Sequence, residues 1–142
     1  EVIERPSLAA TFTGSYYLVN NRGSYLQYRI DFTPESEGAL QGVAAFNVMK
    51  TEFVEGTGSV TSVDKTYNYN YVVDSELGVC TFTAAVEGQE HAAHQLRTCS
   101  ANSDFDLDVV VYESSTVGDT DGWENNYTYL SQDHFDEVSQ YL

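Results

Sequence analysis

The sequence predicts an all-β domain: an antiparallel up-and-down β-barrel, or a two-sheet β-sandwich, of eight or nine strands with a short C-terminal α-helix. Three observations support this prediction. Apolar and polar residues alternate with period two along most of the chain, turn-forming residues recur at intervals of roughly 8–12 positions, and a helical period begins only near residue 131. The connections between expected strands are short and sequential, which favours the barrel.

The first two expected strands, Leu8–Val19 and Ser24–Phe32, form a hairpin. Leu8–Val19 alternates apolar side chains with Thr and Ser, and every second residue of Ser24–Phe32 is apolar. This alternation is typical of strands with one buried and one solvated face. The segment between them, Asn20-Asn21-Arg22-Gly23, contains residues that accept the positive φ angles of a tight turn. Residues 1–7 are expected to precede the hairpin as an N-terminal arm.

The remaining strands are expected between segments rich in Gly, Pro, Asp and Ser, which favour turns. They are Leu40–Glu55, Ser59–Val63, Thr66–Val73, Leu77–Glu87, His91–Ser100, Asp104–Glu113 and Trp123–Leu130. After Ser131, which offers an N-cap, apolar residues recur at helical spacing, so residues 131–142 are expected to form the helix. A length of 142 residues fits a single domain, 1–142.

The predicted architecture is similar to that of lipocalin-like barrels, which also carry a helix after their strands. Gly14-Ser15-Tyr16 stands where those proteins have a Gly-x-Trp signature near the first strand. The similarity therefore concerns the architecture and does not extend to that motif.

Cys80 and Cys99 occupy mirror-image positions around the turn Gly88-Gln89-Glu90. A hairpin centred on this turn places them directly opposite each other, where Cα atoms lie roughly 4.5–5.5 Å apart, within the range of a disulfide. The pair therefore predicts a strand register and a Cys80–Cys99 disulfide. A disulfide in turn predicts a secreted, extracellular or periplasmic protein.

The chain is strongly acidic, with 22 Asp and Glu against six Lys and Arg and a formal net charge of −16. Such a surface repels phosphate backbones, so nucleic acid is not an expected partner. No apolar run approaches the roughly 18 residues of a membrane-spanning helix, so membrane insertion is not expected either. The acidity indicates the solvated surface of an extracellular protein or, alternatively, clustered carboxylates that bind cations.

Asp119, Asp121 and Glu124 form a candidate metal site, because carboxylates gathered in a turn suit Ca²⁺. The alternative is a solvated acidic turn, since the twelve-residue spacing of an EF-hand is absent. Apart from Ca²⁺, no cofactor is expected.

Two other polar patterns contain side chains that can act as metal ligands. Asp104, Asp106 and Asp108 would share one face of an expected strand, where like charges repel unless water or a cation relieves them. His91 and His94 would point to opposite faces of theirs, so a zinc site is not predicted.

Tyr67, Tyr69 and Tyr71 alternate with asparagines, so on a strand the three rings share one face. Such a row can stack on sugar rings or line a cavity, because each ring offers apolar area and a hydroxyl. Alternatively, the rings fill the core through cross-strand pairs. Together with Tyr28 and Trp123, these tyrosines are the candidate ligand-binding residues.

No Gly-x-Ser-x-Gly elbow and no phosphate-binding glycine loop occurs. The leading prediction is therefore a secreted, non-enzymatic module that binds a small apolar or glycan-like ligand through its Tyr-rich face or cavity. The first alternative is a structural or adhesive subunit of an extracellular assembly that self-associates by strand addition through Leu8–Leu18. The second is a small barrel cyclase or isomerase that encloses its substrate around a buried carboxylate, from Glu52 or Asp31.

Overall fold

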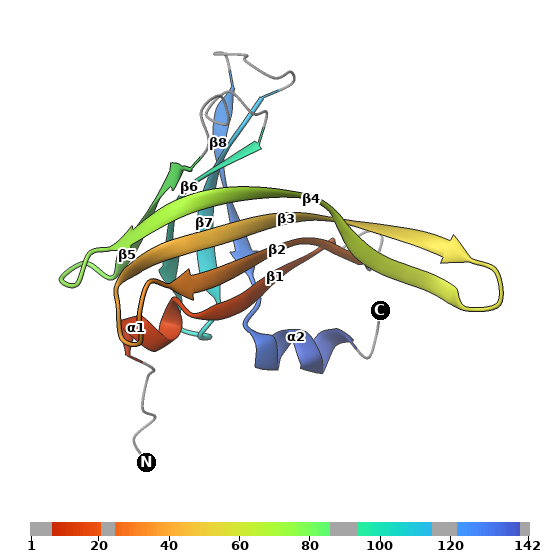
Figure 1. Cartoon of the computed structure of the whole chain (residues 1–142), viewed down its shortest axis with the longest axis horizontal. Coiled ribbons are helices and arrows are strands. Elements are labelled where there is room, and N and C mark those ends of the chain that lie inside the picture. The colour runs from red at the N-terminus through yellow and green to blue at the C-terminus, as the bar shows by residue number, and fades with distance from the viewer. Residues whose placement is uncertain (1–6, 21–24, 86–93, 115–121, 140–142) are drawn as a thin grey trace.

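The structure is a computed structural model that describes residues 7–20, 25–85, 94–114 and 122–139. Eight antiparallel strands follow one another in chain order and curve into a nearly closed barrel (Figure 1). The strands are β1 (Gly14–Asn20), β2 (Tyr25–Pro34), β3 (Gln41–Val54), β4 (Gly58–Val73), β5 (Val79–Ala84), β6 (His94–Ala101), β7 (Leu107–Glu113) and β8 (Trp123–Tyr129), and the helices are α1 (Leu8–Thr11) and α2 (Gln132–Ser139). The predicted up-and-down barrel with its C-terminal helix is confirmed. Among the described residues, no helix has the length and apolar character needed to cross a membrane.

The barrel has two weak seams. β1 and β8 meet at a single bridge, where the Tyr17 N–H donates to the Leu130 carbonyl (2.9 Å) and the Leu130 N–H donates to that of Tyr17 (2.7 Å). β5 and β6 pair only over Val79–Thr81. Beyond those pairs, the Leu96 N–H donates instead to the hydroxyl of Tyr69, which reaches across the interior from β4 (3.2 Å).

The expected first strand is wrong at its beginning, because residues 8–11 form the short helix α1. The Ser7 hydroxyl accepts a hydrogen bond from the Ala10 N–H (3.1 Å), which is the geometry of an N-cap. Leu and Ala are good helix formers, and a few alternating residues do not outweigh a cap followed by such a run. The helix covers one end of the barrel, with Phe12 buried directly after it (Figure 1).

β4 is one strand, where two strands separated by a turn at Asp64-Lys65 were expected. Val48 pairs with Lys65 and Met49 pairs with Val63, so Asp64 is an extra residue in a β-bulge. Past this bulge β3 and β4 continue beyond the barrel as a two-stranded ribbon, seen on the right of Figure 1. We call residues 49–63 the arm.

β7 begins at Leu107 and not at Asp104, because the residues before it form a turn. Asp106 is buried in this turn, where its carboxylate accepts a hydrogen bond from the Ser131 N–H (2.8 Å) and lies 2.7 Å from Nδ1 of His134. These contacts hold the start of α2 against the barrel. The expected row of three aspartates on one strand face is therefore wrong.

The predicted register of the cysteines is confirmed, since Cys80 pairs directly with Cys99. The predicted disulfide is not formed in the structure, where both residues are buried free thiols. A disulfide requires specific side-chain torsions in addition to facing Cα atoms, so the register alone does not determine it. Both thiols instead pack in the apolar core, and burial raises the pKa of the Cys99 thiol.

The hydrophobic core extends along the barrel interior, from Phe12 beside α1 to Phe46 and Val111, and a dense group of aromatic rings lies at the end next to α1. Phe32 is central, because its ring lies 5.1–6.0 Å from the rings of Phe12, Tyr16, Tyr71 and Phe82. All five side chains are buried. This end of the interior is filled by the protein itself.

Candidate ligand site inside the barrel

The tyrosine row of β4 lies on the inner wall of the barrel, and its three rings share one face, as their alternation predicted. Tyr71 and Tyr69 are buried, whereas Tyr67 is half-buried. The Tyr71 hydroxyl donates to the carbonyl of Phe12 (3.1 Å), so this ring is part of the core at the α1 end. The row therefore runs from the filled end of the barrel toward the other end.

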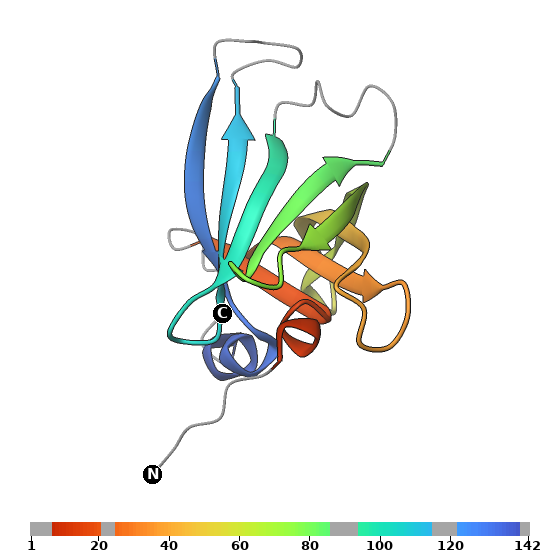
Figure 2. The same ribbon diagram turned by 90° about the vertical axis from the view of Figure 1, so that its left-hand side faces the viewer.

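That other end, which we call the open end, is reached by solvent. Figure 2 shows α1 and α2 together at one end and the first residues of β6 and β8 at the opposite end. Inward-facing side chains near those residues are half-buried, among them Tyr28, Tyr127, His94 and Glu113. The side chains of His94 and Glu113 are 19% and 20% exposed, although both lie on the inner wall.

A cluster of polar side chains lines this inner wall, and we call it the interior polar cluster: His94, Glu113, Asn125, Tyr127 and Tyr129. The Glu113 carboxylate accepts hydrogen bonds from the Tyr127 hydroxyl (2.8 Å) and the Asn125 amide (2.7 Å). Nδ1 of His94, its cross-strand neighbour, lies 3.2 Å away. Sheet register creates the cluster, because β6, β7 and β8 are adjacent strands.

His94 is held neutral with one nitrogen free. Burial lowers its pKa below the usual 6.5, and the Glu113 carboxylate opposes this only in part. The proximity of Glu113 assigns the imidazole proton to Nδ1, which leaves Nε2 as a hydrogen-bond acceptor. Nε2 is buried and has no partner among the described residues.

Tyr129 presents a second unpaired polar atom. Its side chain is fully buried on the inner wall, and its hydroxyl has no partner within the described part of the chain. Burial raises its pKa well above the usual value, and the neighbouring Tyr28, Tyr127 and Glu113 add to this rise, so the hydroxyl keeps its proton. Leaving such a group unpaired costs about 1–3 kcal/mol, which indicates a partner beyond the described residues, such as water or a ligand.

Aromatic rings surround the imidazole of His94. The Phe46 ring stacks on it at 5.2 Å with an interplanar angle of 8°, and the rings of Tyr28 and Tyr127 lie 4.9 Å and 6.5 Å away. Trp123, paired with Glu113 in register, is 51% exposed at the open end. Apolar walls with a few convergent polar groups are typical of small-molecule sites.

Three of the five predicted ligand residues, Tyr28, Trp123 and Tyr67, lie near this cluster. The Tyr67 ring is 6.4 Å from that of Phe46. Tyr69 lies in the middle of the interior, and Tyr71 belongs to the filled end.

The cyclase or isomerase alternative places Glu52 or Asp31 inside the barrel as a buried carboxylate, but neither residue lies there. Asp31 is on the outer face, where it forms an ion pair with Arg29 (2.9 Å) and accepts a hydrogen bond from Asn47 (2.9 Å). Glu52 is exposed on the arm. Asp31 has the strand parity of the outer surface, and Glu52 lies beyond the barrel, so the prediction of a buried carboxylate from either residue is wrong.

The candidate Ca²⁺ site stays a prediction. Asp119 and Asp121 are outside the described residues, and Glu124 is exposed on β8 opposite Tyr112. Within the described ranges, no group of three or more His, Cys, Asp and Glu side chains is placed to hold a metal ion.

Sequence reasoning missed His94 and Glu113 as a pair. One signal was present, because Glu113 continues the alternation of Leu107, Val109 and Val111 and therefore falls on their buried face. A charged residue on an apolar face calls for a partner, but only the register of β6 against β7 shows that the partner is His94.

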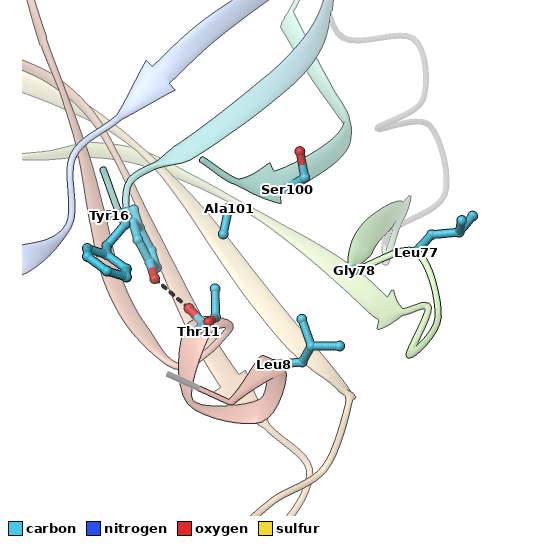
Figure 3. Close-up of a pocket in the computed structure, with 8 residues that line it drawn as sticks. Leu8, Thr11, Tyr16, Leu77, Gly78, Ser100 and Ala101 are labelled. Atoms are coloured by element: carbon cyan, nitrogen blue, oxygen red, sulfur yellow. Dashed lines mark hydrogen bonds between the residues drawn. The ribbon is translucent and has the colours of Figure 1, made fainter. Parts of the chain in front are cut away.

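A pocket lies beside α1, with a volume of about 270 Å³ (Figure 3). Leu8, Leu77, Ala101 and Phe105 contribute apolar surface to it. Its buried hydroxyl, that of Tyr16, already donates to the Thr11 carbonyl, as the dashed line shows. With that group satisfied inside the chain, this pocket offers less to a specific ligand than the interior polar cluster does.

Comparison of the chain with protein-family models, with curated proteins and with solved structures finds no match.

Proposed function

We propose that this protein is a binding barrel whose open end takes a small, mainly apolar ring compound carrying one hydroxyl group. The observation that supports this most directly is the buried Nε2 of His94, which has no partner among the described residues and belongs to a ring stacked on Phe46. An acceptor in such surroundings needs a donor, and a hydroxyl on a ring-shaped ligand supplies it while the ring packs on the aromatic walls. Location outside the cytoplasm stays a prediction.

Within this proposal a single hydroxyl fits better than a glycan. The Glu113 carboxylate is already engaged by Tyr127, Asn125 and His94. A sugar carries several hydroxyls, and each of them needs a partner once it leaves water. Among the described residues, the cluster leaves one acceptor, His94 Nε2, and one hydroxyl, that of Tyr129, without a partner, and a single ligand hydroxyl can donate to the acceptor.

Matched probes test the proposal. Phenol and cyclohexanol carry the hydroxyl, toluene and methylcyclohexane replace it by a methyl group, and methyl glucoside represents the glycan class. Binding can be followed by the fluorescence of Trp123, the single tryptophan, which is partly exposed at the open end. We expect phenol and cyclohexanol to bind more tightly than their methyl counterparts and than methyl glucoside. Absence of binding by all five probes would refute the proposal.

A His94→Phe variant keeps a ring against Phe46 but removes the acceptor. We expect it to lose the preference for phenol over toluene. Tyr71→Phe is the control, because that hydroxyl is bonded to the Phe12 carbonyl at the filled end. An unchanged preference in His94→Phe would show that binding occurs elsewhere.

The His94–Glu113 contact favours a second candidate function, an isomerase. A neutral imidazole oriented by a carboxylate is the arrangement of a general base. Nε2 would take a proton from the carbon next to a ligand carbonyl, the electron pair would move to the carbonyl oxygen, and the imidazolium would return the proton to carbon. Incubation of cyclohexanone with the protein in heavy water tests this, with His94→Phe as control. Deuterium uptake no faster than in buffer would leave binding as the function.

A further inference from the structure

The arm exposes an unpaired strand edge. β2 pairs with β3 only as far as Val48, so within the described residues no strand lies beside Met49–Val54 on the side away from β4. From Lys50 to Val63 every residue except Gly58 is exposed, and Phe53 is 78% exposed. A two-stranded ribbon in water is marginal by itself, and a free edge bearing apolar side chains is a template for another strand.

The sequence of this edge is complementary to a second copy of itself that runs in the antiparallel direction. Around Thr51 the residues read Val48-Met49-Lys50-Thr51-Glu52-Phe53-Val54. Apolar residues stand two and three positions from the centre on both sides, whereas the flanking charges are of opposite sign. Reversing the direction of this segment keeps its apolar pattern and exchanges its charges.

We propose that two copies of the chain pair through this edge, antiparallel, about a twofold axis at Thr51. In that register Lys50 of each copy faces Glu52 of the other on one side of the ribbon. Met49 of each faces Phe53 of the other on the opposite side. The ion pair, the apolar pair and the edge hydrogen bonds each form twice, as a closed twofold interface requires.

The charge distribution favours pairing of two copies through their arms over pairing through their barrels. The chain carries −16, and the arm holds only Lys50, Glu52 and Glu55 of its charged residues, so nearly all of the acidity lies outside the arm. The arm projects from the barrel (Figure 1), and Thr51 is three residues beyond Val48, roughly 10 Å at the rise of a strand. Two copies joined there keep their barrels separated by more than the screening length of about 8 Å.

Charge variants test the pairing by sedimentation velocity across a wide range of concentration. We expect the wild-type chain to dimerise and Lys50→Glu and Glu52→Lys each to be monomeric, because each sets like charges opposite one another. An equimolar mixture of these two variants should recover the dimer, since the two acidic side chains of one variant would then face the two lysines of the other. Both residues are exposed, so the variants should fold normally.

Lys65→Glu is the matched control. It makes the same change in net charge as Lys50→Glu, but on β4, outside the proposed edge, and should leave dimerisation intact. A monomeric wild-type chain, a mixture that stays monomeric, or equal disruption by Lys65→Glu would each overturn the proposal.

A cross-link supplies an independent measurement. Because Thr51 faces its own copy on the axis, Thr51→Cys should form an intermolecular disulfide under mild oxidation. Thr61→Cys, whose wild-type hydroxyl lies 2.9 Å from that of Thr51 on the neighbouring strand, should not. Equal cross-linking of both variants would indicate random collision and contradict the twofold register.

Discussion

The two ends of the barrel interior use the same kind of side chain for different purposes. Next to α1, the hydroxyls of Tyr16 and Tyr71 donate to the carbonyls of Thr11 and Phe12, which are backbone groups of the segment covering that end. The equally buried hydroxyl of Tyr129, which is close enough to Tyr127 and Glu113 of the interior polar cluster for them to affect its pKa, has no partner among the described residues. Whether a buried tyrosine supports the fold or can bind a ligand therefore depends on whether its hydroxyl has a hydrogen-bond partner in the protein. Burial and strand parity do not distinguish the two cases.

The largest expected effect comes from Phe32→Ala at the filled end. The variant removes a ring that contacts four other aromatic rings and leaves a cavity. We expect a loss of about 3–5 kcal/mol in the free energy of unfolding, measured by urea denaturation. The folded fraction should still prefer phenol to toluene. A loss below about 1 kcal/mol would mean that this end is not a packed core.

Glu113→Leu tests the open end. It leaves the Tyr127 hydroxyl, the Asn125 amide and His94 Nδ1 without their acceptor. The expected loss is about 1 kcal/mol, at the low end of the range for unsatisfied groups, because solvent reaches this carboxylate. Glu113→Gln, which keeps one acceptor oxygen, should lose less. Equal stability of the wild type and Glu113→Leu would show that these bonds are not maintained in solution.

The pH dependence of the free energy of unfolding is a further test of the open end, where His94 lies. The pKa of His94 is lowered in the folded state by burial, so the unfolded chain binds this proton more readily. The stabilising effect of keeping His94 neutral is complete above the unfolded pKa of 6.5 and is lost as the pH falls from there through the folded pKa. Denaturation midpoints from about pH 8 to pH 5 should therefore fall more in the wild type than in His94→Gln. Parallel curves would argue against a buried neutral imidazole.

The smallest effects come from removing single hydroxyls. Tyr71→Phe should lose about 1 kcal/mol, because a buried hydrogen bond to Phe12 disappears. Tyr129→Phe should be neutral or slightly stabilising, since no partner among the described residues is lost. Phenol affinity should respond in the opposite way and fall only in Tyr129→Phe. Equal stability losses in the two variants would remove the distinction between the ends.

Local patterns were sufficient to predict much of the fold. The alternation in Ser24–Phe32 identifies the strand that forms β2, and the symmetric positions of Cys80 and Cys99 predict how β5 pairs with β6. The bulge at Asp64 was missed, because Asp-Lys reads equally well as a turn and only continued pairing on the far side distinguishes the two.

The candidate site was predictable only in part. The alternation of Tyr67, Tyr69 and Tyr71 places their rings on one face, but it does not say which hydroxyl finds a backbone partner. That depends on α1 reaching Tyr71 across 59 positions of the chain. The contact between His94 and Glu113 likewise depends on the register of β6 and β7, which carries a shift between Leu96 and Thr98.

The single bridge between Tyr17 and Leu130 has a consequence for how the chain folds during its synthesis. Every other strand pairing joins neighbours in the chain, so the meander can grow hairpin by hairpin as it leaves the ribosome. Closure must wait until Leu130 has emerged, and only then does β8 complete the wall that faces Tyr28 and Phe46. If phenol binds as proposed, the moment at which phenol binding returns during refolding would mark this last step, after most strand pairing is complete.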